Sequence, residues 1–117
     1  MLLLFAAFLA QPTDCHNAMA QQEMNRCAAE AARAADAEMN RAAAQVMRQF
    51  VEHQGGENGE AARRLRDAQR TWLAFRDAQC ALAGVEALGG SLEPYLVGDC
   101  LKNMTEQRTV ELMMMAR

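Results

Sequence analysis

The chain has 117 residues, a formal net charge of -3 at neutral pH and a sequence pI near 5.3. This length fits one small domain, and the acidic balance excludes a generally basic nucleic-acid-binding protein. Hydrophobic residues make up 51% of the chain, but many of them are alanines and aromatic residues account for only 5%. We therefore expect a thin core between closely approaching helices.

The first segment, MLLLFAAFLA at residues 1–10, is wholly apolar and uncharged. Ten residues are too few to span a bilayer, which takes about 20. The segment is typical of the apolar part of a secretory signal, followed by a helical domain over residues 11–117. We expect a periplasmic or secreted protein without stable membrane insertion after processing. The alternative is a buried N-terminal helix.

Residues 17–53 contain no proline or glycine and are rich in helix-forming residues. The pattern predicts one long amphipathic helix, with Asn17 as its N-cap. Apolar residues recur in steps of four and three at Ala28, Ala32, Ala35, Met39, Ala42, Val46 and Phe50. The glycine-rich run at 55–59 ends this helix, and Asn58 is available to cap the next.

Residues 60–83 predict a second helix. Its apolar stripe has the same rhythm and consists of Ala61, Leu65, Ala68, Trp72, Phe75 and Leu82. Trp72 and Phe75 are therefore predicted to lie in the core, and a ligand-binding role for Trp72 is the alternative. Four arginines of this helix are interpreted as a solvated face: Arg63, Arg64, Arg66 and Arg70.

Residues 84–99 contain four glycines and a proline, which predicts a loop with at most a short helical turn. A third helix is expected from about residue 100 to the end, with Asp99 as its N-cap. The run Met113–Met115 is interpreted as helix packing rather than soft-metal binding. Three helices with short connections predict an all-α fold, an antiparallel three-helix bundle with one long N-terminal helix.

Cysteine number supports export, because an even count in a small chain behind a signal-like segment predicts disulfides. The cysteines are Cys15, Cys27, Cys80 and Cys100. Four cysteines allow three pairings. The predicted topology favours Cys15–Cys27 and Cys80–Cys100, since each pair is close along the chain or at one pole. The spacings are too wide for a C-x-x-C metal or redox site, so no metal and no cofactor are predicted. His16 is taken as a loop residue, with metal ligation as the alternative.

Charged residues on the inner faces need partners, because a buried charge is stable only when it is paired. We predict a structural polar network that joins Asp36 to Arg76 or Arg108, with Asn40 assisting. A catalytic interpretation would need a second perturbed carboxylate or a histidine in a cleft. The sequence shows no nucleophile–base pair and no phosphate loop, so we do not expect an enzyme.

An ordered set of motifs resembles a known family. The set comprises Cys15, EMNRCA at 23–28, ADAEMN at 35–40, LRDAQRTWLAFRDAQC at 65–80, GGS at 89–91, Pro94, Cys100 and TEQRTVEL at 105–112. It is similar to the LprI-like lysozyme-inhibitor domain of small exported bacterial proteins. One position departs from the family pattern. Members often have a threonine that forms a capping box with Glu23, where this chain has Ala20.

The resemblance implies an exported protein that binds and inhibits a lysozyme or another peptidoglycan hydrolase. An acidic chain suits a strongly basic enzyme. The predicted contact is the loop at 89–95, through Ser91, Glu93 and Tyr95. The alternative for this loop is that it simply caps the end of the bundle. The alternative for the protein is a periplasmic interaction or structural module with no hydrolase partner.

Overall fold

A computed structural model describes residues 15–116, and the signal-like segment at 1–10 lies outside this range. The described chain forms three long helices, α1 (Gln21–His53), α2 (Glu60–Ala83) and α3 (Glu93–Met115). A single 3-10 turn, η1 (Val85–Ala87), connects α2 to α3. Residues 15–116 contain no strand. The predicted all-α fold of three helices is confirmed.

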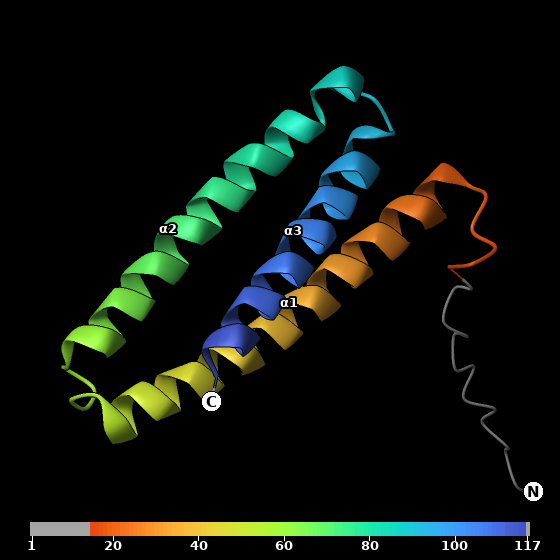
Figure 1. Ribbon diagram of the computed structural model, residues 1–117. Coiled ribbons are helices and arrows are strands. Elements are labelled where there is room, and N and C mark those ends of the chain that lie inside the picture. Colours follow the sequence, from red (N-terminus) through yellow and green to blue (C-terminus); the bar gives the residue numbers. More distant parts are fainter. Residues whose placement is uncertain (1–14, 117) are drawn as a thin grey trace, which may run out of the picture.

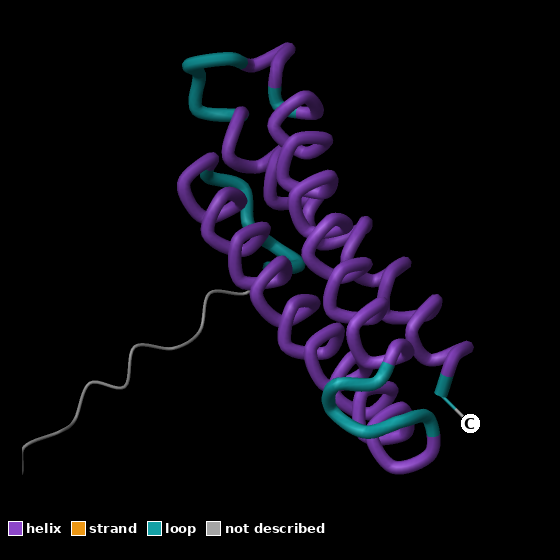
Figure 2. Tube along the Cα trace, turned by 90° about the vertical axis from the view of Figure 1, so that its left-hand side faces the viewer, coloured by secondary structure: helices purple, strands orange, loops and turns teal. Residues whose placement is uncertain are grey.

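The helices run up and down in chain order (Figure 1). α2 runs opposite to α1 and α3, which lie side by side and point the same way (Figures 1 and 2). α1 and α3 share the most extensive contact, and α2 packs mainly on α3. The hydrophobic core accordingly lies where α1 and α3 meet, with Leu65, Trp72 and Leu73 of α2 closing one side.

Helix α1 buries the predicted face. Six of the residues predicted from the spacing are buried: Ala28, Ala32, Ala35, Met39, Ala42 and Val46. The helix begins later than predicted, because Ala20 rather than Asn17 is its N-cap. Ala20 makes no side-chain capping bond, which fits the loss of the family's threonine at this position.

Helix α3 begins at Glu93, about two turns before the predicted start near residue 100. Pro94 lies in its first turn, where a missing backbone N–H has no partner to lose. Gly98, taken from the sequence as part of a loop, is buried within the helix. A Cβ at this position would lie 3.0 Å from the Cβ of Ala28, so glycine allows α3 to approach α1 closely.

Helix α2 is rotated from its predicted orientation. Phe75 is 58% exposed, which contradicts its predicted place in the core, and Leu82 is 61% exposed. Leu65 is buried as predicted, and the other residues that face inward are Ala62, Arg76 and Cys80. Ala62 and Cys80 are 18 residues apart, or about five whole turns, so they lie on one line along the helix. The line that leads to Cys80 faces the bundle because Cys80 is bonded to α3.

Both predicted disulfides are present. Cys15 is bonded to Cys27 and Cys80 to Cys100, with Cα–Cα distances of 5.8 and 5.4 Å. The first bond ties the segment before α1 to its second turn. The second joins the last turn of α2 to the eighth residue of α3, so it closes the end of the bundle that carries η1.

Candidate functional site

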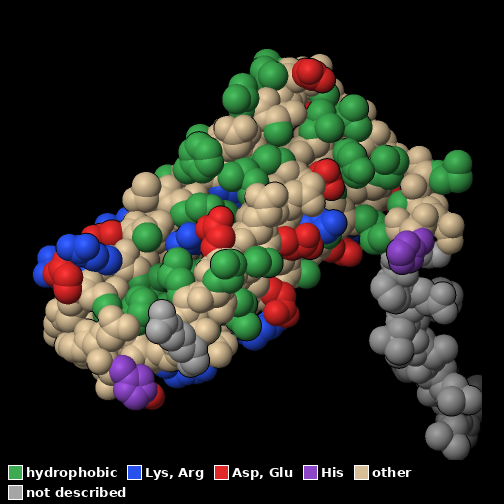
Figure 3. All heavy atoms as spheres, viewed as in Figure 1, with side chains coloured by type: hydrophobic (Ala, Val, Ile, Leu, Met, Phe, Trp, Pro, Cys, Tyr) green, Lys and Arg blue, Asp and Glu red, His purple; other side chains and the backbone are tan. Residues whose placement is uncertain are grey.

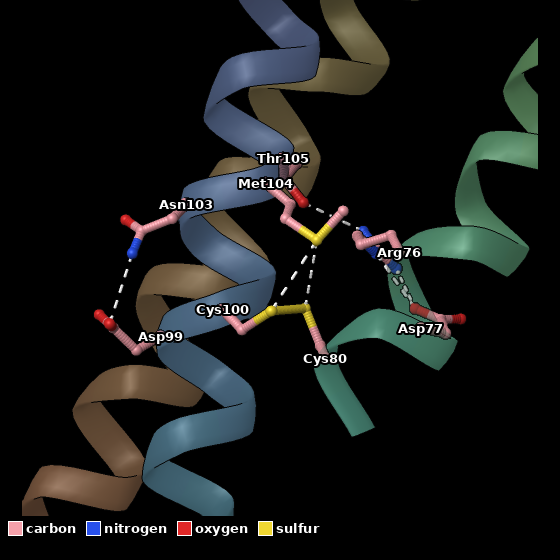
Figure 4. Close-up of a disulfide and its surroundings, with 8 residues drawn as sticks. All are labelled: Arg76, Asp77, Cys80, Asp99, Cys100, Asn103, Met104 and Thr105. Atoms are coloured by element: carbon pink, nitrogen blue, oxygen red, sulfur yellow. Dashed lines mark hydrogen bonds and ion pairs between the residues drawn. A yellow bond between two sulfur atoms is a disulfide. The ribbon is translucent and has the colours of Figure 1, made fainter. Parts of the chain in front are cut away.

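Arg76 is a charged residue on the inner side of α2, and its side chain is only 10% exposed. Its Nη1 donates to the carboxylate of Asp36 at 2.6 Å and to the hydroxyl of Thr105 at 3.2 Å. Its Nε and Nη2 donate to Asp77 at 3.1 and 2.9 Å (Figure 4). Arg76 therefore connects all three helices, and its charge is balanced by two carboxylates at the edge of the core.

The sulfur atoms beside Arg76 form a second packed group. Met104 places its thioether sulfur 3.6 Å from Cys80 Sγ and 3.8 Å from Cys100 Sγ (Figure 4). Polarizable sulfur fills irregular gaps well. This part of the α2–α3 contact thus consists of a disulfide, a thioether and a paired arginine, with little aliphatic packing.

Of the two arginines predicted as partners of Asp36, Arg76 makes the pair, and Arg108 has other partners. Its Nε donates to Gln69 at 2.7 Å and its Nη1 donates to Glu111 at 3.0 Å. Asn40, predicted to assist the network, is exposed on α1, so that assignment is wrong. It projects away because the inward line of α1 passes through its neighbour Met39.

Trp72 is half-buried and packs against the core. The guanidinium carbons of Arg76 and Arg108 lie 5.6 and 5.9 Å from its ring centroid, within the range of a cation–π interaction. Both cations come from inward-facing positions, so the ring is engaged by the fold itself.

The exposed arginines of α2 lie on its outer face and have local partners. Arg64 and Arg63 pair with Glu60 at 2.9 and 3.5 Å, and their proximity lowers the pKa of the Glu60 carboxyl, chiefly through the hydrogen bond from Arg64. Arg70 pairs with Asp67 at 3.2 Å. Short-range pairs of this kind are typical of a solvated helix face.

The predicted contact loop at 89–95 is partly helical, because Glu93 and Tyr95 belong to the first turn of α3. Glu93 accepts a hydrogen bond from the backbone N–H of Gly89 at 2.8 Å, and Tyr95 is half-buried. Ser91 is exposed, and its carbonyl oxygen accepts a bond from Asn25 of α1 at 2.7 Å. These contacts hold the loop against the bundle. A role of the three predicted residues in binding a partner stays a prediction.

The same end of the molecule exposes large apolar side chains that sequence reasoning missed. Leu82, Val85 and Leu88 are 61%, 51% and 74% exposed. The sequence pattern placed Leu82 in the core, and it placed Val85 and Leu88 in a loop with no predicted role. The signal that could have found them is the bonded position of Cys80, which fixes the rotation of α2 and turns Leu82 outward.

Within residues 15–116, no group of three or more His, Cys, Asp or Glu side chains is placed to hold a metal ion. None of the described helices combines the length and the apolar character needed to cross a bilayer. Every fully buried side-chain nitrogen or oxygen of the described chain has a hydrogen-bond partner.

The chain matches a family model described as "Lysozyme inhibitor LprI" over residues 14–112. It belongs to the LprI lysozyme-inhibitor family. A protein of Rhizobium meliloti (strain 1021), described as "Uncharacterized protein R02472", is 44% identical over 105 residues, covering 85% of this chain and 76% of that protein. No solved structure matches. The LprI family is an inhibitor family, and the resemblance predicted from the motifs is confirmed.

Proposed function

We propose that this chain is an exported protein that binds and inhibits a lysozyme. The observation that carries the proposal is the match to the LprI family across residues 14–112, which includes all four cysteines. The two disulfides and the apolar N-terminal segment support export to an oxidising compartment. The partner is a peptidoglycan hydrolase, and inhibition requires binding rather than catalysis by this chain.

Charge supports the choice of partner. The formal net charge of -3 is complementary to a strongly basic enzyme such as a c-type lysozyme. Attraction of this kind speeds encounter and weakens as salt is added. It does not distinguish specific inhibition from loose association, so the test needs a control for charge alone.

The test is a turbidity assay of cell-wall lysis with the disulfide-bonded protein, purified from the periplasm of an expression host. We expect saturable inhibition that reaches one inhibitor per enzyme. An unrelated acidic protein of similar pI serves as the control and should give no saturable inhibition. Absence of inhibition of c-, g- and i-type lysozymes at micromolar concentration would refute the proposal.

The second candidate is a periplasmic interaction module without a hydrolase partner. The exposed apolar side chains near η1 favour some protein partner, whatever its identity. Binding to a periplasmic protein without any effect on cell-wall lysis would support this candidate.

A further inference from the structure

A ridge of exposed apolar side chains follows the outer side of α2 and continues into η1. Phe75 and Leu82 are seven residues apart, about two turns, and so share one side of the helix. The backbone stays helical through Gly84, with φ -84° and ψ -4°, and Val85 and Leu88 follow Leu82 in steps of three. We call these four residues, Phe75, Leu82, Val85 and Leu88, the apolar ridge.

Nothing in the described fold covers the ridge, and each of its members is more than half exposed. Single apolar residues at a surface need no explanation, whereas a contiguous set marks a contact site. Figure 3 shows green side chains along the outer edge of α2 and over the end of the molecule that carries η1. Packing of α2 on α3 does not need the ridge, since Arg76 and the Cys80–Cys100 bond lie on the inner side.

Apart from the buried Arg76, which is paired with Asp77, the charges close in sequence to the ridge are acidic. Residues 78–101 contain Glu86, Glu93 and Asp99 and no lysine, arginine or histidine. In Figure 3 the upper end shows red side chains among the green ones, and blue appears only lower down. An apolar strip bordered by carboxylates suits a partner with an apolar contact bordered by cations.

The same charges disfavour a second copy of this chain as the occupant. A symmetric dimer places each surface patch against its own counterpart. Two ridges in contact would therefore bring Glu86 and its acidic neighbours toward the same residues of the other copy, and like charges across an interface cost binding energy.

We propose that the apolar ridge is the surface on which this chain binds a basic lysozyme, with Leu82 and Leu88 as apolar anchors and Glu86 as a charged contact. This inference rests on the proposed function and names its surface. It moves the centre of the contact from Ser91, Glu93 and Tyr95 to their exposed neighbours in sequence.

The test compares two matched double variants in binding to a c-type lysozyme by calorimetry. Leu82→Ser with Leu88→Ser should raise the dissociation constant about 30-fold or more, as expected for loss of central apolar anchors. The control is Val110→Ser with Met114→Ser, which alters residues that are 60% and 79% exposed on α3. The control should bind like the wild type, and circular dichroism should show both variants folded.

Two charge-reversal variants test the acidic residues beside the ridge. Glu86→Lys should weaken binding about 3- to 10-fold at low salt, mainly through slower association, and the difference should shrink as salt is added. Glu57→Lys makes the same change in the exposed loop between α1 and α2 and should have a smaller effect.

Three outcomes would overturn the proposal. If the wild type binds lysozyme and both double variants bind it as tightly as the wild type does, the ridge is not the binding surface, and the proposed function survives. If the wild type binds no lysozyme, the function and its surface fail together. If sedimentation shows a wild-type dimer that the ridge variant converts to a monomer, the ridge is a self-association surface.

Discussion

The contact between α1 and α3 and the contact of α2 with both differ in chemistry. α1 and α3 meet through small and aliphatic side chains, and Gly98 lets the backbones approach closely at Ala28. α2 meets them through the buried Ala62 and Leu65 and the half-buried Trp72, and also through the paired Arg76 and the Cys80–Cys100 disulfide. The first contact is mainly apolar, and the second combines a smaller apolar contact with a few directional interactions.

This difference explains how a short chain keeps an apolar surface available. Apolar burial stabilises in proportion to area and needs no particular group. A covalent bond and a paired charge add to the apolar contact of Ala62 and Leu65 in holding α2, and Phe75 and Leu82 stay outside.

The largest expected effect tests the aliphatic contact. Leu112 of α3 is fully buried, so Leu112→Ala should lower the free energy of unfolding by about 2 to 5 kcal/mol through lost burial and a cavity. Phe75→Ala is the control on α2 and should change it by no more than about 0.5 kcal/mol, as at other surface sites. Urea unfolding at neutral pH measures both. Similar losses for the two variants would contradict the described position of α2.

A slightly smaller effect tests the covalent attachment of α2. Replacing Cys80 and Cys100 by serine opens a loop of sequence separation 20 and should cost about 3 kcal/mol in the chain-entropy account. Native-state hydrogen exchange should show the loss of protection concentrated in α2.

The matched control removes the other disulfide. Cys15–Cys27 closes a separation of 12, so its loss should cost a similar amount, but protection should fall at the start of α1. Uniform loss of protection in both variants would show that α2 does not unfold separately.

The sequence predicted the aliphatic contact better than the polar one. In α1 the apolar spacing alone identified the buried face, because its other sides are polar or charged. In α3 the turn-forming residues gave a wrong prediction, because Pro94 and Gly98 taken alone predict a loop. Both fit a helix here, since Pro94 lies in the first turn and Gly98 faces Ala28 of α1. Close approach of a neighbouring helix is invisible in a single sequence.

In α2 the spacing predicted one face, and the structure buries a face about one residue away from it. One face contains Phe75 and Leu82, and the other contains Arg76 and Cys80. Hydrophobicity favours the first, whereas the disulfide selects the second. The candidate surface was missed for this reason, since an apolar ridge and a core stripe have the same pattern until a fixed contact gives the rotation.

The smallest expected effect concerns the charge pairing of Arg76. Asp36 is 42% exposed at its side chain, and Asp77 offers a second carboxylate, so either one alone leaves the guanidinium paired. Asp36→Ala and Asp77→Ala should each lower the free energy of unfolding by about 1 kcal/mol. In the double variant the loss should exceed the sum by on the order of 1 kcal/mol, because the buried charge then has no carboxylate partner.

Arg76→Met separates a stranded charge from lost packing. Methionine keeps much of the volume and removes the buried charge, and such replacements of buried ion pairs are often neutral or stabilising. Arg76→Met should therefore be less destabilising than the double carboxylate variant, although it removes more of the hydrogen bonds. Urea unfolding of the two single carboxylate variants, the double variant and Arg76→Met measures these differences in the free energy of unfolding. If the carboxylate losses are simply additive and Arg76→Met costs more than both together, the hydrogen bonds to Asp36, Asp77 and Thr105 hold α2 directly, and charge balance is secondary.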